Sequence, residues 1–265
     1  MISAILAIIS IFPLSFLMYA MSERMVARHE SRVGKQIAFR NFIWQTWVDA
    51  RLEIKNIESK TTWILYAFQL SIVGLIALNF DYLIFIYLAV SGYLLIALAH
   101  GKNQVTKRIE SDGQQVRFAV SSAIAILCLF GCFTISKTTN MSSVSWNFGQ
   151  LLFVIPFQLS GMILFGEHPF QGMLDKKGWL QSARFYVWSM LTAKLFLGGG
   201  EYFFDFHLKA TILYLGFRIC GIYFPRFHQK DLLRISILYL FPITGVLWLI
   251  AMLGFALFEP GGARV

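Results

Sequence analysis

Apolar runs with few or no charged residues recur along the whole of this 265-residue chain. Eight of them are long enough to cross about 30 Å of hydrocarbon as helices, which rise about 1.5 Å per residue. They lie near residues 2–21, 62–80, 83–100, 117–135, 148–166, 183–199, 206–224 and 235–258. Since a bilayer core offers no water to backbone N–H and C=O groups, spanning segments must be helical. The sequence therefore predicts an all-α, polytopic membrane protein, with about eight transmembrane helices in a single membrane domain over residues 1–265.

The composition supports this class. Of the residues, 57% are hydrophobic and 14% are charged, and the mean hydropathy is +0.63. Soluble domains are about 45–50% apolar and about 25% charged. A soluble core of this size could not hide so much apolar surface, so a soluble enzyme is excluded.

Basic residues gather in alternate connections between the apolar runs, and the net charge is +9. These residues are Arg24, Arg28, Arg32, Lys35, Arg40, Arg51, Lys55 and Lys60, then Lys102, Lys107, Arg108 and Arg117, then Lys176, Lys177 and Arg184, and finally Arg226, Lys230 and Arg234. Basic loops indicate the cytoplasmic or matrix face of a membrane. We therefore expect both termini on the opposite face, the non-cytoplasmic or non-matrix side. Because membrane orientation accounts for the excess charge, we expect no nucleic-acid partner.

The first connection is too long for a simple turn, and residues 37–55 have the pattern of an amphipathic helix. Apolar and charged residues alternate there at helical spacings: Phe39, Phe42, Ile43, Trp47 and Leu52, with Arg40, Asp49, Arg51 and Glu53 between them. A helix of this kind lies in the plane of the membrane interface. The sequence thus predicts one interfacial helix in contact with lipid, held there by Trp44 and Trp47.

Ionisable residues within apolar runs are costly and tend to face a bundle interior or a cavity. Lys194 in the sixth run, Arg218 in the seventh and Glu167 at the end of the fifth are therefore candidates for a proton route. Lys194 could instead pair with Glu201 or Asp205, or extend its ammonium group to the interface.

No metal or flavin site is indicated. The histidines, at positions 29, 100, 168, 207 and 228, show no ligand spacing, and Cys128 and Cys132 lie one helical turn apart without an acid or histidine beside them. The chain also has no phosphate-binding loop, dinucleotide fingerprint, CxxC pair or nucleophile elbow. We expect no catalytic residue in this chain, and any redox chemistry would belong to partner subunits.

Several short motifs resemble the H subunit of respiratory complex I, which is called subunit 1 in mitochondria. They are Glu23-Arg24-Met25-Val26-Ala27-Arg28 with Arg32-Val33-Gly34, Gln45-Thr46-Trp47-Val48-Asp49-Ala50, Pro169-Phe170, Leu195-Phe196-Leu197-Gly198-Gly199, and Pro225-Arg226-Phe227 with Leu232-Leu233-Arg234. The motifs follow the family's order, and the resemblance covers roughly residues 1–258.

The resemblance implies the heel of the membrane arm of an NADH:quinone oxidoreductase, where electron transfer to quinone is coupled to proton translocation. Its partners would be other membrane-arm subunits and the iron–sulfur subunits of the peripheral arm. Quinone would be a substrate shared with those partners. The residues implied at the quinone chamber or the docking surface are Glu23, Arg24, Arg28, Arg32, Gln45, Asp49, Pro169, Phe170 and Arg226. The membrane would be the mitochondrial inner membrane or a bacterial plasma membrane.

The chain departs from the family mainly in its acidic residues. Leu164 and Gly166 stand where the family has Glu and Arg, Gln171 stands in place of Asp, and Ala119 in place of another acid. The first motif is one residue short, and the conserved segment that follows its glycine in the family is missing. These losses fit an alternative, the equivalent subunit of a complex I-like membrane-bound hydrogenase or formate hydrogenlyase. A stand-alone transporter or channel, lined by Lys194, Arg218 and Glu167, is an alternative of another class.

Overall fold

The computed structural model describes residues 13–21, 24–25, 44, 47–48, 51, 108–136, 148–164, 179–198, 203–223 and 229–258. Residues 13–21 are helical, and the longer helical elements are α5 (Arg108–Ser136), η2 (Phe148–Gln150), α6 (Leu151–Leu164), α7 (Trp179–Phe196), α8 (Phe203–Tyr223), α9 (Gln229–Ile235), the π-helix η3 (Ser236–Leu240) and α10 (Phe241–Phe258). Strands are absent from these ranges, which confirms the all-α prediction for them.

Two stretches are long and apolar enough to cross a membrane: Ala119–Ser136 in α5, and Leu233–Gly254 through α9, η3 and α10. Only 39% of the first and 11% of the second is buried. Large side chains such as Leu249 and Leu253 are exposed, as is typical of helices that face lipid or other membrane subunits. These helices support membrane association.

The number of spans stays a prediction. Residues 62–80 and 83–100, which account for two of the expected spans, lie outside the described residues. The single-domain organisation and the side on which the termini lie also stay predictions.

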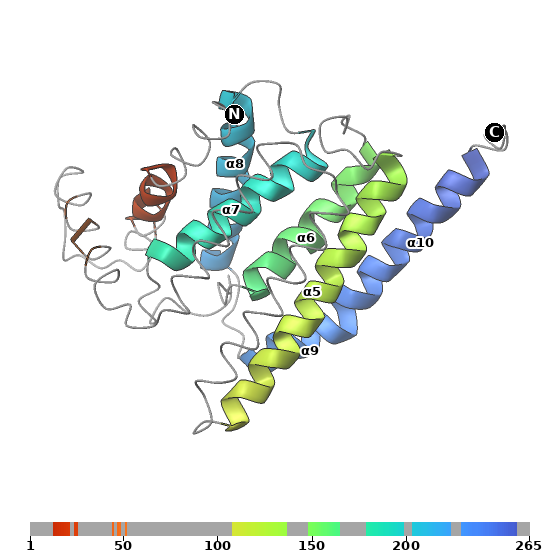
Figure 1. Cartoon of the computed structure of the whole chain (residues 1–265), viewed down its shortest axis with the longest axis horizontal. Helices are drawn as coiled ribbons and strands as arrows, with labels where there is room; N and C mark the ends of the chain where they lie inside the picture. The colour runs from red at the N-terminus through yellow and green to blue at the C-terminus, as the bar shows by residue number, and fades with distance from the viewer. Residues whose placement is uncertain are drawn as a thin grey trace.

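The helices pack in the order α10, α5, α6, α7, α8, each against the next (Figure 1). This order places α7 inside the bundle. Nearly all of its described side chains are buried, from Phe185 to Phe196. A helix that is buried all round, and not along one stripe, is typical of the centre of a bundle.

Aromatic packing joins α7 to α6. The rings of Phe157 and Trp188 stack with their centroids 4.6 Å apart, and Phe196 packs on the same Phe157 ring at 5.0 Å. The Trp188 Nε1–H also donates a hydrogen bond of 2.9 Å to the Phe157 carbonyl. The indole thus contributes packing and also satisfies its own polar atom.

Two glycines allow neighbouring helices to approach closely. A Cβ atom on Gly131 of α5 would fall on the ring of Phe153, and one on Gly161 of α6 would fall on the ring of Trp188. Both rings are buried, so a shift of either would disturb the packing around it. Close approach through small residues is a common basis of helix association in membranes.

We predict that Gly131→Ala and Gly161→Ala each destabilise the folded chain by about 1–3 kcal/mol, because overpacking displaces a buried ring. Thermal unfolding of the purified chain in detergent measures this effect. Gly216→Ala and Gly245→Ala are matched controls, since their Cβ atoms would meet nothing within 4 Å. Equal melting temperatures for all four variants would contradict the packing described here.

Candidate functional site

The buried helix α7 carries polar side chains that point into the bundle. Tyr186, Ser189 and Thr192 are fully buried, and Lys194 is half-buried. We call these four residues the α7 seam. A polar group removed from water is costly unless it is hydrogen-bonded. The chemistry open to the α7 seam therefore depends on the hydrogen-bond partners that its side chains find on neighbouring helices.

On the α6 side, the amide of Gln158 binds two hydroxyl groups of the seam. Gln158 Nε2 donates to Ser189 Oγ at 2.6 Å, and Thr192 Oγ1 donates to Gln158 Oε1 at 2.6 Å. The same two hydroxyls lie within hydrogen-bonding distance of backbone carbonyls one turn earlier, those of Phe185 at 3.0 Å and Trp188 at 2.9 Å. One fully buried amide therefore fixes α6 against α7.

On the α8 side, Tyr186 pairs with a histidine. The Tyr186 hydroxyl lies 3.2 Å from His207 Nδ1, and the two rings are nearly parallel, at 11°. Tyr214 packs edge-on against Tyr186 with centroids 5.9 Å apart, and Phe206 lies 5.3 Å from the His207 ring. The pair is thus enclosed by aromatic rings at the α7–α8 contact.

The C-terminal end of α7 needs donors for its last carbonyl groups, which have no partner within the helix. The chain turns away at Gly198, whose φ of 61° is the left-handed conformation that glycine adopts readily. Within this turn the Leu197 N–H donates to the Ala193 carbonyl at 3.2 Å. From α5, the Cys132 thiol donates to the Leu195 carbonyl, also at 3.2 Å.

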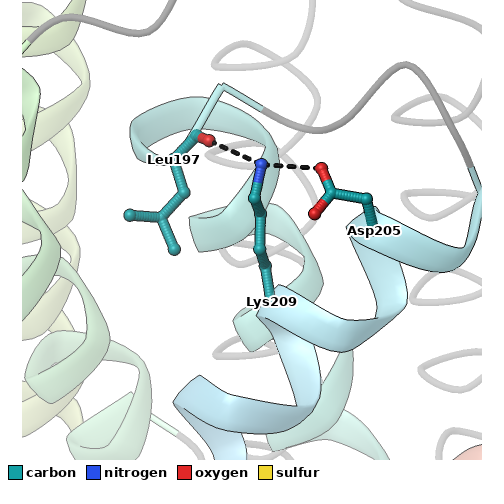
Figure 2. Close-up of polar contacts among 3 residues, drawn as sticks. All are labelled: Leu197, Asp205 and Lys209. Carbon is teal, nitrogen blue, oxygen red and sulfur yellow. Dashed lines mark hydrogen bonds and ion pairs between the residues drawn. The ribbon is translucent and has the colours of Figure 1, made fainter.

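A lysine of α8 completes this end. Lys209 Nζ donates to the Leu197 carbonyl at 3.2 Å and forms an ion pair of 2.8 Å with Asp205 (Figure 2). Positive charge is favourable at a helix C-terminus because the helix dipole is negative there. Lys194, in the last turn of α7, adds a second cation to the same end.

The structure places two of the three proposed proton-route residues. Lys194 lies at the C-terminal end of α7, while Arg218 lies in the second half of α8 with its guanidinium 5.9 Å from the Tyr214 ring centroid. Lys209 of α8 contacts the C-terminal end of α7, where Lys194 lies. Arg218 is nine residues beyond Lys209, or about 13 Å along α8, so Lys194 and Arg218 lie in different parts of the bundle. Asp205, one possible partner of Lys194, pairs with Lys209.

Most of the residues assigned to the quinone chamber lie outside the described residues. These are Glu23, Arg28, Arg32, Gln45, Asp49, Pro169, Phe170 and Arg226, together with Glu167 of the proton route. Arg24 is described and half-buried in a short helical segment. Trp44 and Trp47 are exposed, at 68% and 51%, and the Trp47 ring meets Phe16 edge-on at 6.1 Å.

Five residues of this site have no counterpart among the sequence-predicted candidates: Gln158, Ser189, Thr192, Tyr186 and His207. The sequence does contain a sign of them: a Gln or His inside an apolar run is costly unless it has a partner on a neighbouring helix. Within the described ranges, no group of three or more His, Cys, Asp or Glu side chains could hold a metal ion. The side chains of the α7 seam and their partners can form hydrogen bonds and exchange protons.

Comparison with known proteins adds one structural likeness. No protein-family model and no curated protein matches this chain. A chain in the structure of the membrane-bound sulfane sulfur reductase, an archaeal respiratory membrane complex, is similar with a TM-score of 0.64 and 16% sequence identity. The likeness covers 94% of this chain and 98% of that one. The two chains therefore share a fold over nearly their whole lengths.

We predict that Gln158→Met destabilises the folded chain by about 1 kcal/mol. Hydrogen bonds between membrane helices contribute about 0.6 kcal/mol each on average, and two are lost. Ser160→Ala is the matched control, since its equally buried hydroxyl binds only the Phe157 carbonyl of its own helix. Unfolding in detergent should show Gln158→Met as the less stable variant. The reverse order would contradict a role for Gln158 in joining α6 to α7.

A second prediction concerns the end of α7. Lys209→Met removes both the carbonyl contact and the ion pair, whereas Asp205→Asn leaves the contact with Leu197. We expect Lys209→Met to cost about 1 kcal/mol and Asp205→Asn less, because a partly exposed ion pair contributes little by itself. Melting temperatures of the two variants test the order. If Asp205→Asn is the more damaging, the ion pair is the main contact.

Proposed function

We propose that this chain is the heel-type membrane subunit of a multisubunit respiratory redox complex, which anchors the complex's peripheral redox arm in the membrane. The observation that carries the proposal is the fold shared with a chain of an archaeal respiratory membrane complex over 94% of this sequence. The motif resemblance to the H subunit of complex I points to the same class of protein.

The described residues fit such a division of labour. The outer faces of α5 and α10 are apolar and exposed, as expected of a chain that lipid and other membrane subunits surround. The interior has hydrogen-bonded polar residues, and the described part of it offers no metal-binding group. Electron transfer would therefore take place in iron–sulfur partner subunits, and this chain would hold them at the membrane.

For the substrate, our leading proposal is quinone. Arg24, Arg28 and Arg32 would place positive charge beside the quinone head group, which favours a reduced, partly anionic intermediate. Asp49 would fix a neighbouring basic group or carry a proton locally. The exposed indoles of Trp44 and Trp47 support an interfacial position for the helix that would border this chamber.

A second candidate is a related membrane complex that does not use quinone. The sequence lacks the family's acidic residues, and the structural likeness is to a complex named as a sulfane sulfur reductase. A membrane-bound hydrogenase, a formate hydrogenlyase or a reductase of sulfur compounds would each need an anchoring subunit of this fold. The partner subunits decide between these chemistries.

The test is purification through a terminal tag in a mild detergent, followed by mass spectrometry and assays of the purified material. We expect iron–sulfur subunits to copurify, with flavin-containing subunits and NADH:quinone activity in the leading case. A nickel–iron module, or sulfur reduction without quinone activity, would favour the second candidate. A stable chain without redox partners that moves a solute in vesicles would contradict both and support a transporter. An untagged strain identifies proteins that bind the resin nonspecifically.

A further inference from the structure

The Tyr186–His207 pair is a titratable contact that anchoring a redox arm does not require. Both side chains are buried, with exposed fractions of 0% and 6%, and the hydroxyl oxygen lies 3.2 Å from Nδ1. The two residues come from different helices of the bundle. An ionisable group at this depth is costly, and it therefore indicates a function.

Packing alone does not explain the pair. Aromatic rings pack against the pair: Tyr214 lies edge-on to Tyr186, and Phe206 lies edge-on to His207. Replacing both partners of a buried hydrogen bond by apolar groups of the same shape can leave stability nearly unchanged. The bundle could thus close around two phenylalanines, and the pair provides chemistry that those would not.

The Tyr186 hydroxyl has two neighbouring groups with which it can form a hydrogen bond. One is His207 Nδ1, and the other is the side chain of Thr211, one turn further along α8, which also interacts with Tyr186. A phenol can donate or accept a hydrogen bond by rotation of its O–H, and a neutral imidazole nitrogen can take up a proton. Tyr186 can therefore donate to Nδ1 when His207 is neutral, and accept from Nδ1–H when it is protonated.

We propose that Tyr186 and His207 form a proton-loading site inside the bundle, which takes up and releases one proton as the complex turns over. In loading, a hydronium O–H bond breaks and an Nδ1–H bond forms, which leaves water and an imidazolium. The Tyr186 O–H turns toward Thr211, and its oxygen accepts the new N–H. Release to water reverses each step, and no electron moves.

The charged side chains described on α7 and α8 are less suited to proton uptake than the Tyr186–His207 pair. They are Lys194, Asp205, Lys209 and Arg218. Asp205 is the one acid of this set, and Lys209 already engages it at 2.8 Å. Arg218 lies against Tyr214, the ring that packs edge-on against Tyr186. Among these groups, His207 is the one whose side chain has a ring nitrogen that can accept a proton and that faces the Tyr186 hydroxyl.

The inference rests on the proposed function, and it is tested on the assembled complex in sealed vesicles. His207→Gln is the decisive variant, because the amide oxygen still accepts a hydrogen bond from Tyr186 but does not take up a proton. We expect this variant to assemble and to consume electron donor, while the number of protons translocated per electron falls by about half or more. A pH-sensitive dye outside the vesicles reports the protons, and donor consumption reports the electrons.

Two further variants keep the test decisive. Tyr186→Phe keeps the packed ring and loses the hydroxyl, so it should lower the same ratio even if His207→Gln fails to assemble. Tyr239→Phe removes an exposed hydroxyl from η3 and should leave the ratio unchanged.

Each outcome bears on a separate statement. A wild-type ratio in both His207→Gln and Tyr186→Phe overturns the loading site and leaves the proposed function intact. A wild-type complex that transfers electrons but no protons overturns it as well. A chain that purifies without redox partners contradicts the proposed function, and the loading site fails with it.

Discussion

The structure depends on the burial of α7, because a polar group buried there is costly unless it is hydrogen-bonded. Gln158 serves two hydroxyls of the seam, and the Trp188 indole serves a carbonyl of α6. Lys209, from the neighbouring helix, satisfies the carbonyl of Leu197 in the turn that follows α7. These contacts fix which helices are neighbours and how they are rotated, which apolar contacts alone would specify less well.

The helices could be predicted from the sequence because long apolar runs allow few other structures. The run at 183–199 ends one residue beyond Gly198, where the left-handed turn follows α7. The pairing of polar residues was harder to predict. Asp205 and Lys209 are four apart on one helix, a spacing visible in the sequence, yet Asp205 was considered as a partner of Lys194. The pattern did not indicate Gln158 or His207, because the partner of each lies on another helix and cannot be deduced from spacing.

The departures from the H-subunit pattern and the fold likeness bear on different questions. A fold shared over most of the chain concerns how the helices are arranged, whereas the missing acids concern how charge moves among them. The described interior contains hydroxyl, amide, phenol and imidazole groups along α6, α7 and α8. A bundle can therefore keep the same arrangement of helices while the polar groups inside it differ.

The π-helix η3 has a consequence for how the length of this chain can vary. Its defining contact runs from the Phe241 N–H to the Ser236 carbonyl, five residues back, just before Pro242, which has no N–H to donate. Loss of one residue between 236 and 240 would place the same two groups four residues apart, which is the ordinary α-helical bond, and would leave the following side chains on nearly the same faces of the helix. Leu247, Trp248 and Ala251, which pack on the core that α5 helps to form, would then stay against it. In an alignment of relatives, a gap of one residue should therefore be tolerated in this segment more readily than elsewhere in α10.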